Sequence, residues 1–410
     1  MTTKRNLTIM WFANFFIAAS MTLIIPFISL YINSFGNFSE SNVQSWSGWI
    51  FSVAFITALI FSPIWGRIGD KYGRKKILIM SATGLAVSVL LMGFATNVWQ
   101  LFFLRLFMGV FTGFIPMSQA FISIQTPKEI AGKVLGTLQT GSITGMLMGP
   151  LFGGLIADAF GYANTFKWMS LTLFISALLV TFGIKEIQLK VTSMEDRKSY
   201  TLKEVIRQIV KQPMLLIVML LVVLVQVAHL SIQPILSLYV IELNGLENIA
   251  LISGITFSAA GLGNLFMAKR WGALGDRIGY VKILIILLFA AGIFYFPGAF
   301  VTSVWQLVIL RFLLGVAIGG MIPVRVAYIR QKAPLSMQGE VLGYNSSLRF
   351  LGNVIGPALG GVISGLYGFS AVFFVTSGLL IVSGVIMLGV WYKYEYEGDF
   401  ELPHIKLGKH

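Results

Sequence analysis

Cysteine is absent from the chain, which excludes disulfide bonds, thiolate metal sites and cysteine nucleophiles. Charged residues are scarce as well: they make up 11% of the 410 residues, whereas soluble domains contain about 25%. A chain with so few charges cannot cover a water-exposed surface, so a soluble enzyme is excluded. The sequence also lacks paired carboxylates, a plausibly spaced Ser and His pair and a set of metal ligands, so we expect neither an enzyme nor a metal site.

The few charges are mostly positive and give a formal net charge of +14. Nucleic-acid-binding proteins gather such charge on one polar surface, but here the basic residues are scattered between long apolar runs. We therefore expect the partner to be a lipid bilayer and not a nucleic acid.

Apolar runs dominate the chain, of which 56% is hydrophobic. A helix needs about 20 apolar residues to cross a membrane, and runs of that length recur with only short breaks. The first run is too long for the core of a signal peptide, so we interpret it as a spanning helix. The sequence predicts twelve such helices: 7–32, 46–66, 76–95, 98–122, 134–157, 164–184, 214–240, 250–269, 281–301, 304–329, 340–363 and 370–392.

A polar stretch in the middle of the chain separates the first six predicted helices from the last six. Within it, residues 201–211 form either a short amphipathic helix at the membrane surface or a solvated linker, and both alternatives are open. We predict an all-α membrane protein with an N-terminal six-helix bundle over residues 1–184, a cytoplasmic linker over 185–212, a C-terminal six-helix bundle over 213–393 and a cytoplasmic tail over 394–410.

Lysine and arginine are distributed very unevenly between alternate loops. With the N-terminus on the cytoplasmic side, the inner loops carry almost all of the basic residues that lie outside the helices, and the outer loops carry only Lys167. Because cytoplasmic loops of membrane proteins are enriched in Lys and Arg, we predict that both termini are cytoplasmic.

The two halves of the sequence repeat each other. The pattern Trp-Gly-x-x-Gly-Asp-x-x-Gly-x-x-Lys-Ile-Leu-Ile begins at Trp65 and recurs 206 residues later at Trp271. A second pattern, which contains Arg105, recurs at the same offset around Arg311, and two further ordered matches follow at offsets of 207 and 208. Six helices were therefore duplicated in parallel orientation, an architecture whose substrate sites lie near the midplane between the halves.

The loop after the second predicted helix reads Gly66-Arg67-Ile68-Gly69-Asp70-Lys71-Tyr72-Gly73-Arg74-Lys75-Lys76. It matches the signature of the major facilitator superfamily almost residue for residue, and the whole chain resembles a twelve-helix transporter of that superfamily. Gly66 and Gly73 permit a tight turn and a close helix approach. In the family, the matching Asp and Arg form an inner latch against the start of helix 11; the alternative is a turn that serves topology alone. The resemblance implies a gating role for Gly66, Asp70, Gly73, Arg74 and the repeat counterpart Asp276.

The fifth predicted helix carries a glycine at every fourth position. The glycines at 141, 145, 149 and 153 leave one helical face without side chains, so another helix can pack against its backbone, and Pro150 bends the helix. The pattern resembles the antiporter motif of drug-exporting facilitators; the alternative is close packing alone, and the eleventh predicted helix repeats the pattern. The residues of the resemblance are Gly145, Gly149, Pro150, Gly153 and Gly154.

Residues 135–138, 344–349 and 368–373 are similar to the bacterial multidrug branch of the superfamily, which includes fluoroquinolone and fosfomycin efflux proteins. This resemblance implies a multi-pass protein of the bacterial plasma membrane that exports small amphiphilic drug-like substrates by alternating access. It also implies antiport of protons, with the proton gradient as the energy source and no cofactor. We expect the protein to act as a monomer.

Charged residues inside a bilayer are costly, so each one is a functional hypothesis. None of the sixteen acidic residues falls in the middle of a predicted helix, whereas proton-driven exporters often use a buried carboxylate. Four arginines do lie within predicted helices: Arg105, Arg311, Arg325 and Arg349. Arg105 matches a helix 4 arginine of the family that is proposed to take part in proton coupling, and the alternative is an anchor bonded to carbonyl groups.

His229 is the only histidine within a predicted helix and the only intramembrane side chain of a type that titrates near neutrality. We interpret it as a proton carrier, with Arg105 and Asp70 as the other candidates for proton coupling; the alternative is a hydrogen-bonded core histidine. If His229 carries no proton, carboxylates at helix ends must titrate instead, namely Glu242, Glu340 and Asp158 or Asp70.

Arg325 and Arg349 break the symmetry of the repeat, because their counterparts are Ser118 and Ser142. They are the best candidates for the substrate site, and the alternative is a role in helix packing. Buried cations without a buried anion make the cavity electropositive, so we expect an amphiphilic cargo with a carboxylate or phosphonate group. The predicted substrate-binding residues are Arg325, Arg349, Arg311, Gln226, Gln233 and Asn14.

A second function fits the same features, namely a narrow-specificity transporter or lipid flippase for an anionic endogenous amphiphile. A non-transporting membrane receptor is disfavoured, because it would more naturally carry a soluble domain larger than the predicted linker.

Overall fold

A computed structural model describes residues 2–126, 131–185, 202–245, 247–333 and 338–398. Within these ranges the regular structure is helical, and twelve segments are long and apolar enough to cross a membrane, as predicted. The helices are α1 (Thr2–Leu23), α2 (Ile28–Asn33), α3 (Glu40–Tyr72), α4 (Arg74–Met92), α5 (Val98–Val110), α6 (Phe114–Ile124), α7 (Ala131–Phe160), α8 (Tyr162–Gly183), α9 (Leu202–Val210), α10 (Pro213–Ser231), α11 (Leu236–Asn244), α12 (Ile249–Ile278), α13 (Tyr280–Tyr295), α14 (Val304–Lys332), α15 (Gln338–Tyr367) and α16 (Phe369–Gly398).

Prolines interrupt the first and seventh membrane segments at equivalent points of the repeat. Pro26 lies in a 3-10 turn, Ile25–Phe27, between α1 and α2, and Pro234 lies in another, Gln233–Ile235, between α10 and α11. Proline has no backbone N–H and a fixed φ, so it interrupts a helix and is favoured at the first position of the next one.

Two helices extend well beyond their predicted ends. α3 continues past residue 66 to Tyr72, and α12 continues past residue 269 to Ile278. The predicted ends mark where the apolar run stops, but a helix that has left the hydrocarbon layer can continue in water. The chain reverses instead at Gly73 and Gly279, whose φ angles of 101° and 100° favour glycine.

Each half has its own hydrophobic core, and matching hydrogen bonds fix the helices in both. The indole Nε1 of Trp65 donates to Val110 O at 2.6 Å, and that of Trp271 donates to Val316 O at 2.8 Å. The repeat seen in the sequence is therefore also a repeat of contacts. The predicted bundle boundaries at residues 184, 212 and 393 stay predictions, and most of the linker and the tail beyond residue 398 lie outside the described residues.

The linker ends in a helix, which favours the amphipathic alternative for residues 201–211. Helix α9 buries Val205 and Ile209 in the core of the C-terminal bundle and exposes Ile206 and Val210. Its location at a membrane surface stays a prediction.

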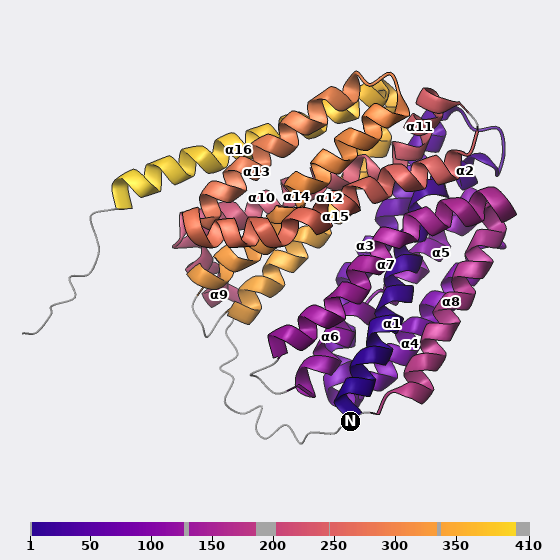
Figure 1. The fold of residues 1–410 in the computed structure, drawn as a ribbon, viewed down its shortest axis with the longest axis horizontal. Coiled ribbons are helices and arrows are strands. Elements are labelled where there is room, and N and C mark those ends of the chain that lie inside the picture. Colours follow the sequence, from indigo (N-terminus) through magenta and orange to yellow (C-terminus); the bar gives the residue numbers. More distant parts are fainter. Residues whose placement is uncertain (1, 127–130, 186–201, 246, 334–337, 399–410) are drawn as a thin grey trace, which may run out of the picture.

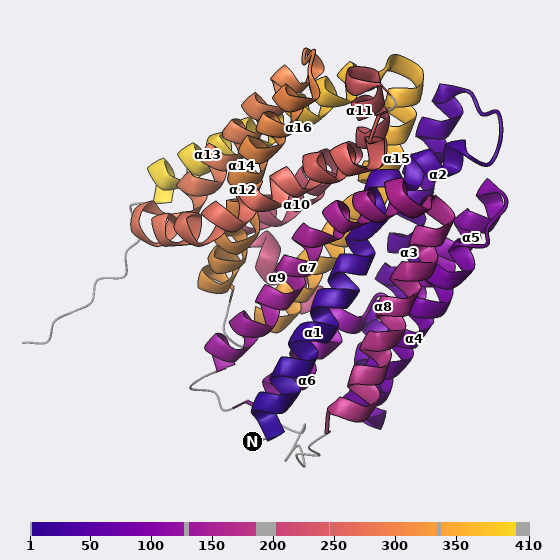
Figure 2. The same cartoon turned by 45° about the vertical axis from the view of Figure 1, so that its right-hand side comes forward.

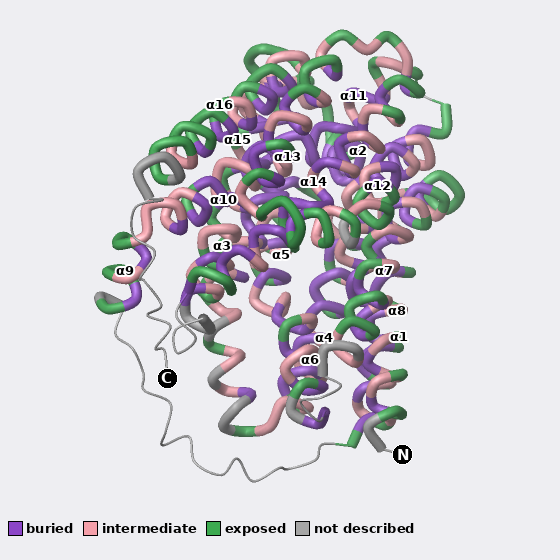
Figure 3. Tube along the Cα trace, turned by 60° about the vertical axis from the view of Figure 1, so that its left-hand side comes forward, coloured by how far each residue is buried: buried purple, intermediate pink, exposed green. Residues whose placement is uncertain are grey.

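The two bundles meet at one end and diverge toward the other (Figures 1 and 2). They meet near α2 and α11, whereas the N-terminus and α9 lie at the diverging end. Buried positions gather where helices face one another, and α16 exposes apolar residues such as Val382 and Val385 along its outer face (Figure 3). We call the end near α2 and α11 the closed end and the end with the N-terminus the open end.

Candidate transport site and gates

Two helix pairs join the bundles at the closed end, and both depend on glycine. In the first pair, α3 packs against α15 so closely that a Cβ on Gly48 would collide with the carbonyl oxygen of Pro357 and lie 3.0 Å from the Cα of Gly361. One turn further on, a Cβ on Gly365 would lie 2.9 Å from Ser41 O. Backbones can approach this closely only where side chains are missing.

The second pair, α7 and α12, repeats the same contact. A Cβ on Gly254, the counterpart of Gly48, would collide with Pro150 O, and a Cβ on Gly154 would collide with Ala250 O. A hydrogen bond from Ser258 Oγ to Leu147 O at 2.9 Å adds to this interface. Within the described residues, the hydrogen bonds and glycine contacts that we find between the bundles all lie in the half of the molecule nearer the closed end.

Asp158, in the last turn of α7, caps the first turn of α12 across the interface. Ala250 N donates to Oδ1 at 3.2 Å, and Leu251 N donates to Oδ2 at 2.9 Å. The N-cap residue of α12 itself, Asn248, has a left-handed backbone and makes no capping hydrogen bond with its side chain. A carboxylate suits this position because the first N–H groups of a helix are unpaired and carry partial positive charge.

The glycine face of α7 packs against α1 inside the N-terminal bundle, which confirms the predicted close approach. A Cβ on Gly145, Gly149 or Gly153 would collide with the α1 backbone, and one on Gly141 would lie 2.6 Å from Trp11 O. The residues of the antiporter motif thus face two ways: Gly145, Gly149 and Gly153 pack within one bundle, whereas Pro150 and Gly154 face α12 of the other.

The predicted gating loop forms the turn between α3 and α4. Gly73 makes this turn. No described atom lies within 4 Å of a Cβ built on Gly66, so the part of the chain that the structure describes shows no close helix approach there, and Gly69 packs against Met117 instead. Arg74 donates from Nη1 to Ala120 O, within its own bundle. The side chain of Asp70 lies outside the described residues. Its counterpart Asp276 accepts a hydrogen bond from the Tyr280 hydroxyl.

Arg105 is buried in the N-terminal bundle and bonded to the backbone. Its Nε donates to Ile50 O at 3.3 Å, and its guanidinium lies 5.7 Å from the centroid of the Phe51 ring. This geometry fits the anchor that we gave as the alternative to proton coupling.

Arg311, the repeat counterpart of Arg105, keeps the equivalent ring contact, because its guanidinium lies 5.8 Å from the centroid of Phe257, the counterpart of Phe51. Its polar neighbours differ. Its side chain is buried to 1% exposure inside the C-terminal bundle, and its Nε and Nη1 have no hydrogen-bond partner. The electrostatic neighbours of Arg311 include His229 on α10 and Tyr295 on α13. His229 Nδ1 and the Tyr295 hydroxyl are buried and unpaired as well. Three neighbouring side chains in one bundle core therefore carry buried polar atoms without a hydrogen bond of good geometry among the described residues, which is costly unless they bind something or exchange a proton.

Arg325 on α14 and Arg349 on α15 are electrostatic neighbours whose like charges repel each other. Nε of each is buried without a partner, and so is Oδ1 of Asn345, one turn from Arg349. Within the described residues neither arginine forms an ion pair. Arg311 does not belong to this pair, because it lies 14 residues from Arg325 on α14, about 21 Å along the helix.

The remaining predicted substrate residues are dispersed. Asn14 is buried between α1 and α6, where its Oδ1 accepts a hydrogen bond from Ser118 Oγ at 2.9 Å. Gln226 lies against Gly352 of α15, and Gln233 is buried in the turn that precedes α11. Gly352 lies one turn from Arg349, so Gln226 is the one of these three whose contact is near the arginines. Asn14 makes its hydrogen bond in the other bundle. The assignment of all three to the substrate site stays a prediction.

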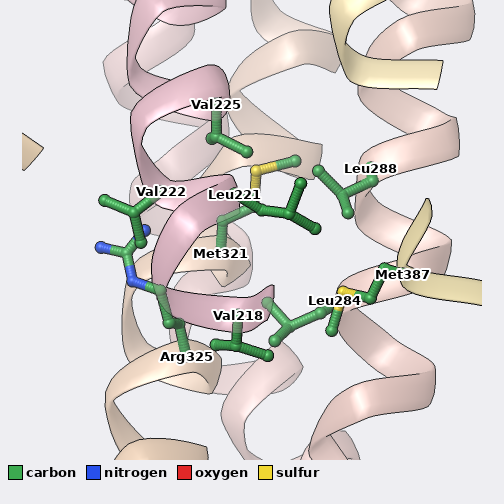
Figure 4. Close-up of a pocket in the computed structure, with 9 residues that line it drawn as sticks. All are labelled: Val218, Leu221, Val222, Val225, Leu284, Leu288, Met321, Arg325 and Met387. Atoms are coloured by element: carbon green, nitrogen blue, oxygen red, sulfur yellow. The ribbon is translucent and has the colours of Figure 1, made fainter. Parts of the chain in front are cut away.

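A small apolar cavity lies inside the C-terminal bundle, between α10, α13, α14 and α16 (Figure 4). Its volume of about 20 Å³ is room for about one water molecule, so it cannot hold a drug-sized cargo. Arg325 contributes to the wall, but its guanidinium points away from Leu284 and Met387 on the opposite side.

Two residues of these sites escaped the sequence prediction. Tyr295 has Val89 as its repeat counterpart, so a comparison of the two halves would have shown a polar group added to one of them. The sequence identifies Asp158 only as a carboxylate at a helix end, because its bonds to α12 depend on tertiary structure.

Two repeated bundles of membrane-spanning helices, whose contacts among the described residues gather at one end, have the architecture of a membrane transporter. The chain belongs to the major facilitator superfamily, because the model of the Major Facilitator Superfamily matches residues 10–273 and 251–401. It is thus a multi-pass cell-membrane protein that transports a small molecule and is not an enzyme.

Curated relatives match over nearly the whole chain. The Uncharacterized MFS-type transporter YuxJ of Bacillus subtilis (strain 168) is 53% identical over 384 residues, which cover 94% of this chain and 97% of that protein. The Multidrug resistance protein MdtG of Salmonella typhi is 42% identical over 383 residues, which cover 93% and 94%.

Solved structures share the fold at low sequence identity. A bacterial homologue of the human lysosomal transporter Spinster, in an inward-facing and occupied conformation, matches with a TM-score of 0.78 and 13% identity over 96% of this chain and 97% of that one. The nucleoside transporter NupG matches with a TM-score of 0.78 and 13% identity over 95% and 99%. At this identity the likeness shows the fold alone.

Proposed function

We propose that the protein exports amphiphilic drug-like molecules by alternating access, in exchange for protons. The observation that carries the proposal is the asymmetry of the interface, since the glycine pairs and the Asp158 cap close one end while the bundles diverge at the other. Relatives that are 42% identical and named multidrug resistance proteins support drug-like cargo.

The distribution of basic residues supports cytoplasmic termini, which orients the transporter. In that orientation the closed end faces outward and the open end faces the cytoplasm, from which an exporter must load its cargo. We further propose that a monomer is sufficient, because both bundles that form the interface come from one chain.

Arg325 and Arg349 are the proposed anchor for the cargo. Two neighbouring guanidinium groups, each with a buried Nε–H that has no partner among the described residues, suit a carboxylate or phosphonate, which accepts several such bonds at once. An anion between them also removes their mutual repulsion. The cargo is therefore an amphiphile with an acidic group.

His229 is the proposed proton carrier, with Arg105 and Asp70 in supporting roles. When His229 is protonated, its positive charge and that of Arg311 are neighbours in the core of the C-terminal bundle. Like charges in a medium of low dielectric constant repel strongly, so protonation favours a rearrangement of α10 against α14. Such a rearrangement supplies the link between proton binding and the change of conformation.

The test is uptake of a drug into proteoliposomes with and without an imposed pH gradient. We expect uptake to rise when the lumen is made more acidic than the outside, because protons then leave the vesicle as the drug enters. Uptake that is indifferent to the gradient would remove proton antiport.

The second candidate function is a narrow-specificity transporter or flippase for an anionic endogenous amphiphile. The unpaired charges of Arg325 and Arg349, with no ion pair among the described residues, favour it as much as drug export. Transport of matched anionic and cationic dyes, and of a fluorescent anionic lipid, distinguishes the two. Movement of the lipid alone selects the flippase, and a preference for the cationic dye refutes the acidic cargo.

A further inference from the structure

A surface groove lies between α4 and the junction of α5 and α6, near the open end of the N-terminal bundle. Its volume is about 460 Å³. The ring of Phe111 lies directly over Gly84, where a Cβ would collide with it, and forms one side of the groove. The residues that line the groove are Lys76, Ile79, Met80, Thr83, Gly84 and Phe111.

The surroundings of the groove are apolar and exposed, as expected for a face that contacts lipid. On α4, Val87 and Leu91 are exposed and continue the helical face of Lys76 and Met80, because positions three or four apart share a face. Phe107, one turn before Phe111 on α5, is exposed as well. Large apolar side chains exposed on membrane-spanning helices contact acyl chains, so the groove is open to them.

Lys76 supplies a positive charge at one end of the groove, with no ion-pair partner among the described residues. Its neighbours are already bonded: Arg74 donates to Ala120 O, and Lys75 Nζ donates to Ile184 O at 2.8 Å. Lys76 is exposed and makes no hydrogen bond or ion pair with any described residue. It lies in the first turn of α4, where the helix enters the membrane and lipid phosphates are found.

The repeat provides an internal comparison, because the counterparts of two lining residues contact α16 in the C-terminal bundle. Thr83 corresponds to Phe289, whose ring packs against Gly384 of α16. Lys76 corresponds to Lys282, whose Nζ lies 5.4 Å from the ring centroid of Trp391, which is also on α16. Packing of the fold therefore tolerates an aromatic ring at this position, and the N-terminal bundle has a threonine instead, with a lysine that has no ion-pair partner among the described residues.

We propose that this groove binds an anionic phospholipid, with the phosphate on Lys76 and one acyl chain along Met80, Thr83 and Phe111. A basic residue at the end of an apolar groove between membrane helices complements the charge of the headgroup and the apolar chain of such a lipid. With the orientation proposed above, the lipid comes from the cytoplasmic leaflet. The inference does not depend on the identity of the cargo or on proton coupling.

The test is titration of the purified full-length protein with phosphatidylglycerol, followed by native mass spectrometry. We expect the first phosphatidylglycerol to bind more tightly than phosphatidylcholine. Lys76→Gln should weaken it about fivefold, the factor for one basic residue at an anionic surface. Thr83→Phe, which places an aromatic ring at a lining position of the groove, should abolish the first binding step, and glycerol phosphate without acyl chains should not compete.

Lys282→Gln is the matched control, because it removes the same charge at the equivalent position of the other bundle. It should leave the first binding step unchanged, and thermal unfolding in phosphatidylcholine verifies that all three variants fold. If Lys282→Gln weakens binding as much as Lys76→Gln, or if neither Lys76→Gln nor Thr83→Phe changes it, the lipid contacts are nonspecific and the proposal is wrong.

Discussion

Asp158→Asn is the most informative single change at the closed end. The substitution keeps the size of the side chain, removes its charge and replaces one carboxylate oxygen with an amide group that cannot accept a hydrogen bond from Ala250 N or Leu251 N. Since the N-cap residue of α12, Asn248, makes no capping bond of its own, nothing on that helix takes over the lost cap.

The expected cost follows from the bonds that are lost. A helix cap contributes about 0.5–2 kcal/mol, and a hydrogen bond to a charged group contributes about 1.5–3 kcal/mol. Because asparagine keeps one acceptor oxygen, we expect a loss of about 1–2 kcal/mol. The bonds exist only while the bundles are joined at this end, so the equilibrium should shift about 5- to 30-fold toward states in which the end is open.

Distance measurements between spin labels can detect this shift, and the absence of native cysteine means that only introduced residues react. Asn33→Cys on α2 and Tyr367→Cys on α15 place exposed labels on the two bundles at the closed end. We expect a population at longer distance to grow in the Asp158→Asn protein. Ser303→Ala is the control, because Ser303 Oγ accepts from Trp305 N and caps α14 within its own bundle. If the labelled protein gives the same distance distribution with and without Asp158→Asn, the role of the cap is refuted.

The remaining predictions concern the interface, the cargo and the proton. Gly254→Val should lower transport at least about tenfold without loss of folding, because its side chain would collide with Pro150 O of the other bundle and keep the closed end from forming. The control is Gly343→Val, whose side chain has open space, and this variant should transport normally. Arg325→Gln should raise the KM for an anionic cargo about tenfold, the equivalent of one charged hydrogen bond, and leave the KM for a neutral cargo unchanged. His229→Gln should abolish the response of uptake to a pH gradient and leave exchange at equal pH intact; a gradient response that survives this change would assign the proton to another group.

Much of the fold follows from local sequence patterns. Apolar runs predict the twelve helices, and repeated motifs predict the matched contacts of Trp65 and Trp271, because both depend on residues within one segment or one repeat. The close packing of Gly145 and Gly149 is also predictable, since a face without side chains suits only a close neighbour. The sequence does not say which helix that neighbour is.

The details of the sites are harder to predict, because they depend on tertiary contacts. Gly66 has no close neighbour since α3 continues as a helix to Tyr72, and hydropathy does not mark where a helix ends in water. Arg105 and Arg311 occupy the same position in the repeat, yet one is bonded to a carbonyl group and the other lies beside His229. Such differences arise from neighbours on other helices, which a single sequence does not identify.

The most direct test of proton-coupled export is the pH inside proteoliposomes when cargo is added without any imposed gradient. Proton antiport predicts that an anionic amphiphile entering the vesicles drives protons out, that the lumen becomes more alkaline, and that His229→Gln abolishes this change. Entry of the cargo with no change in the internal pH would contradict the account.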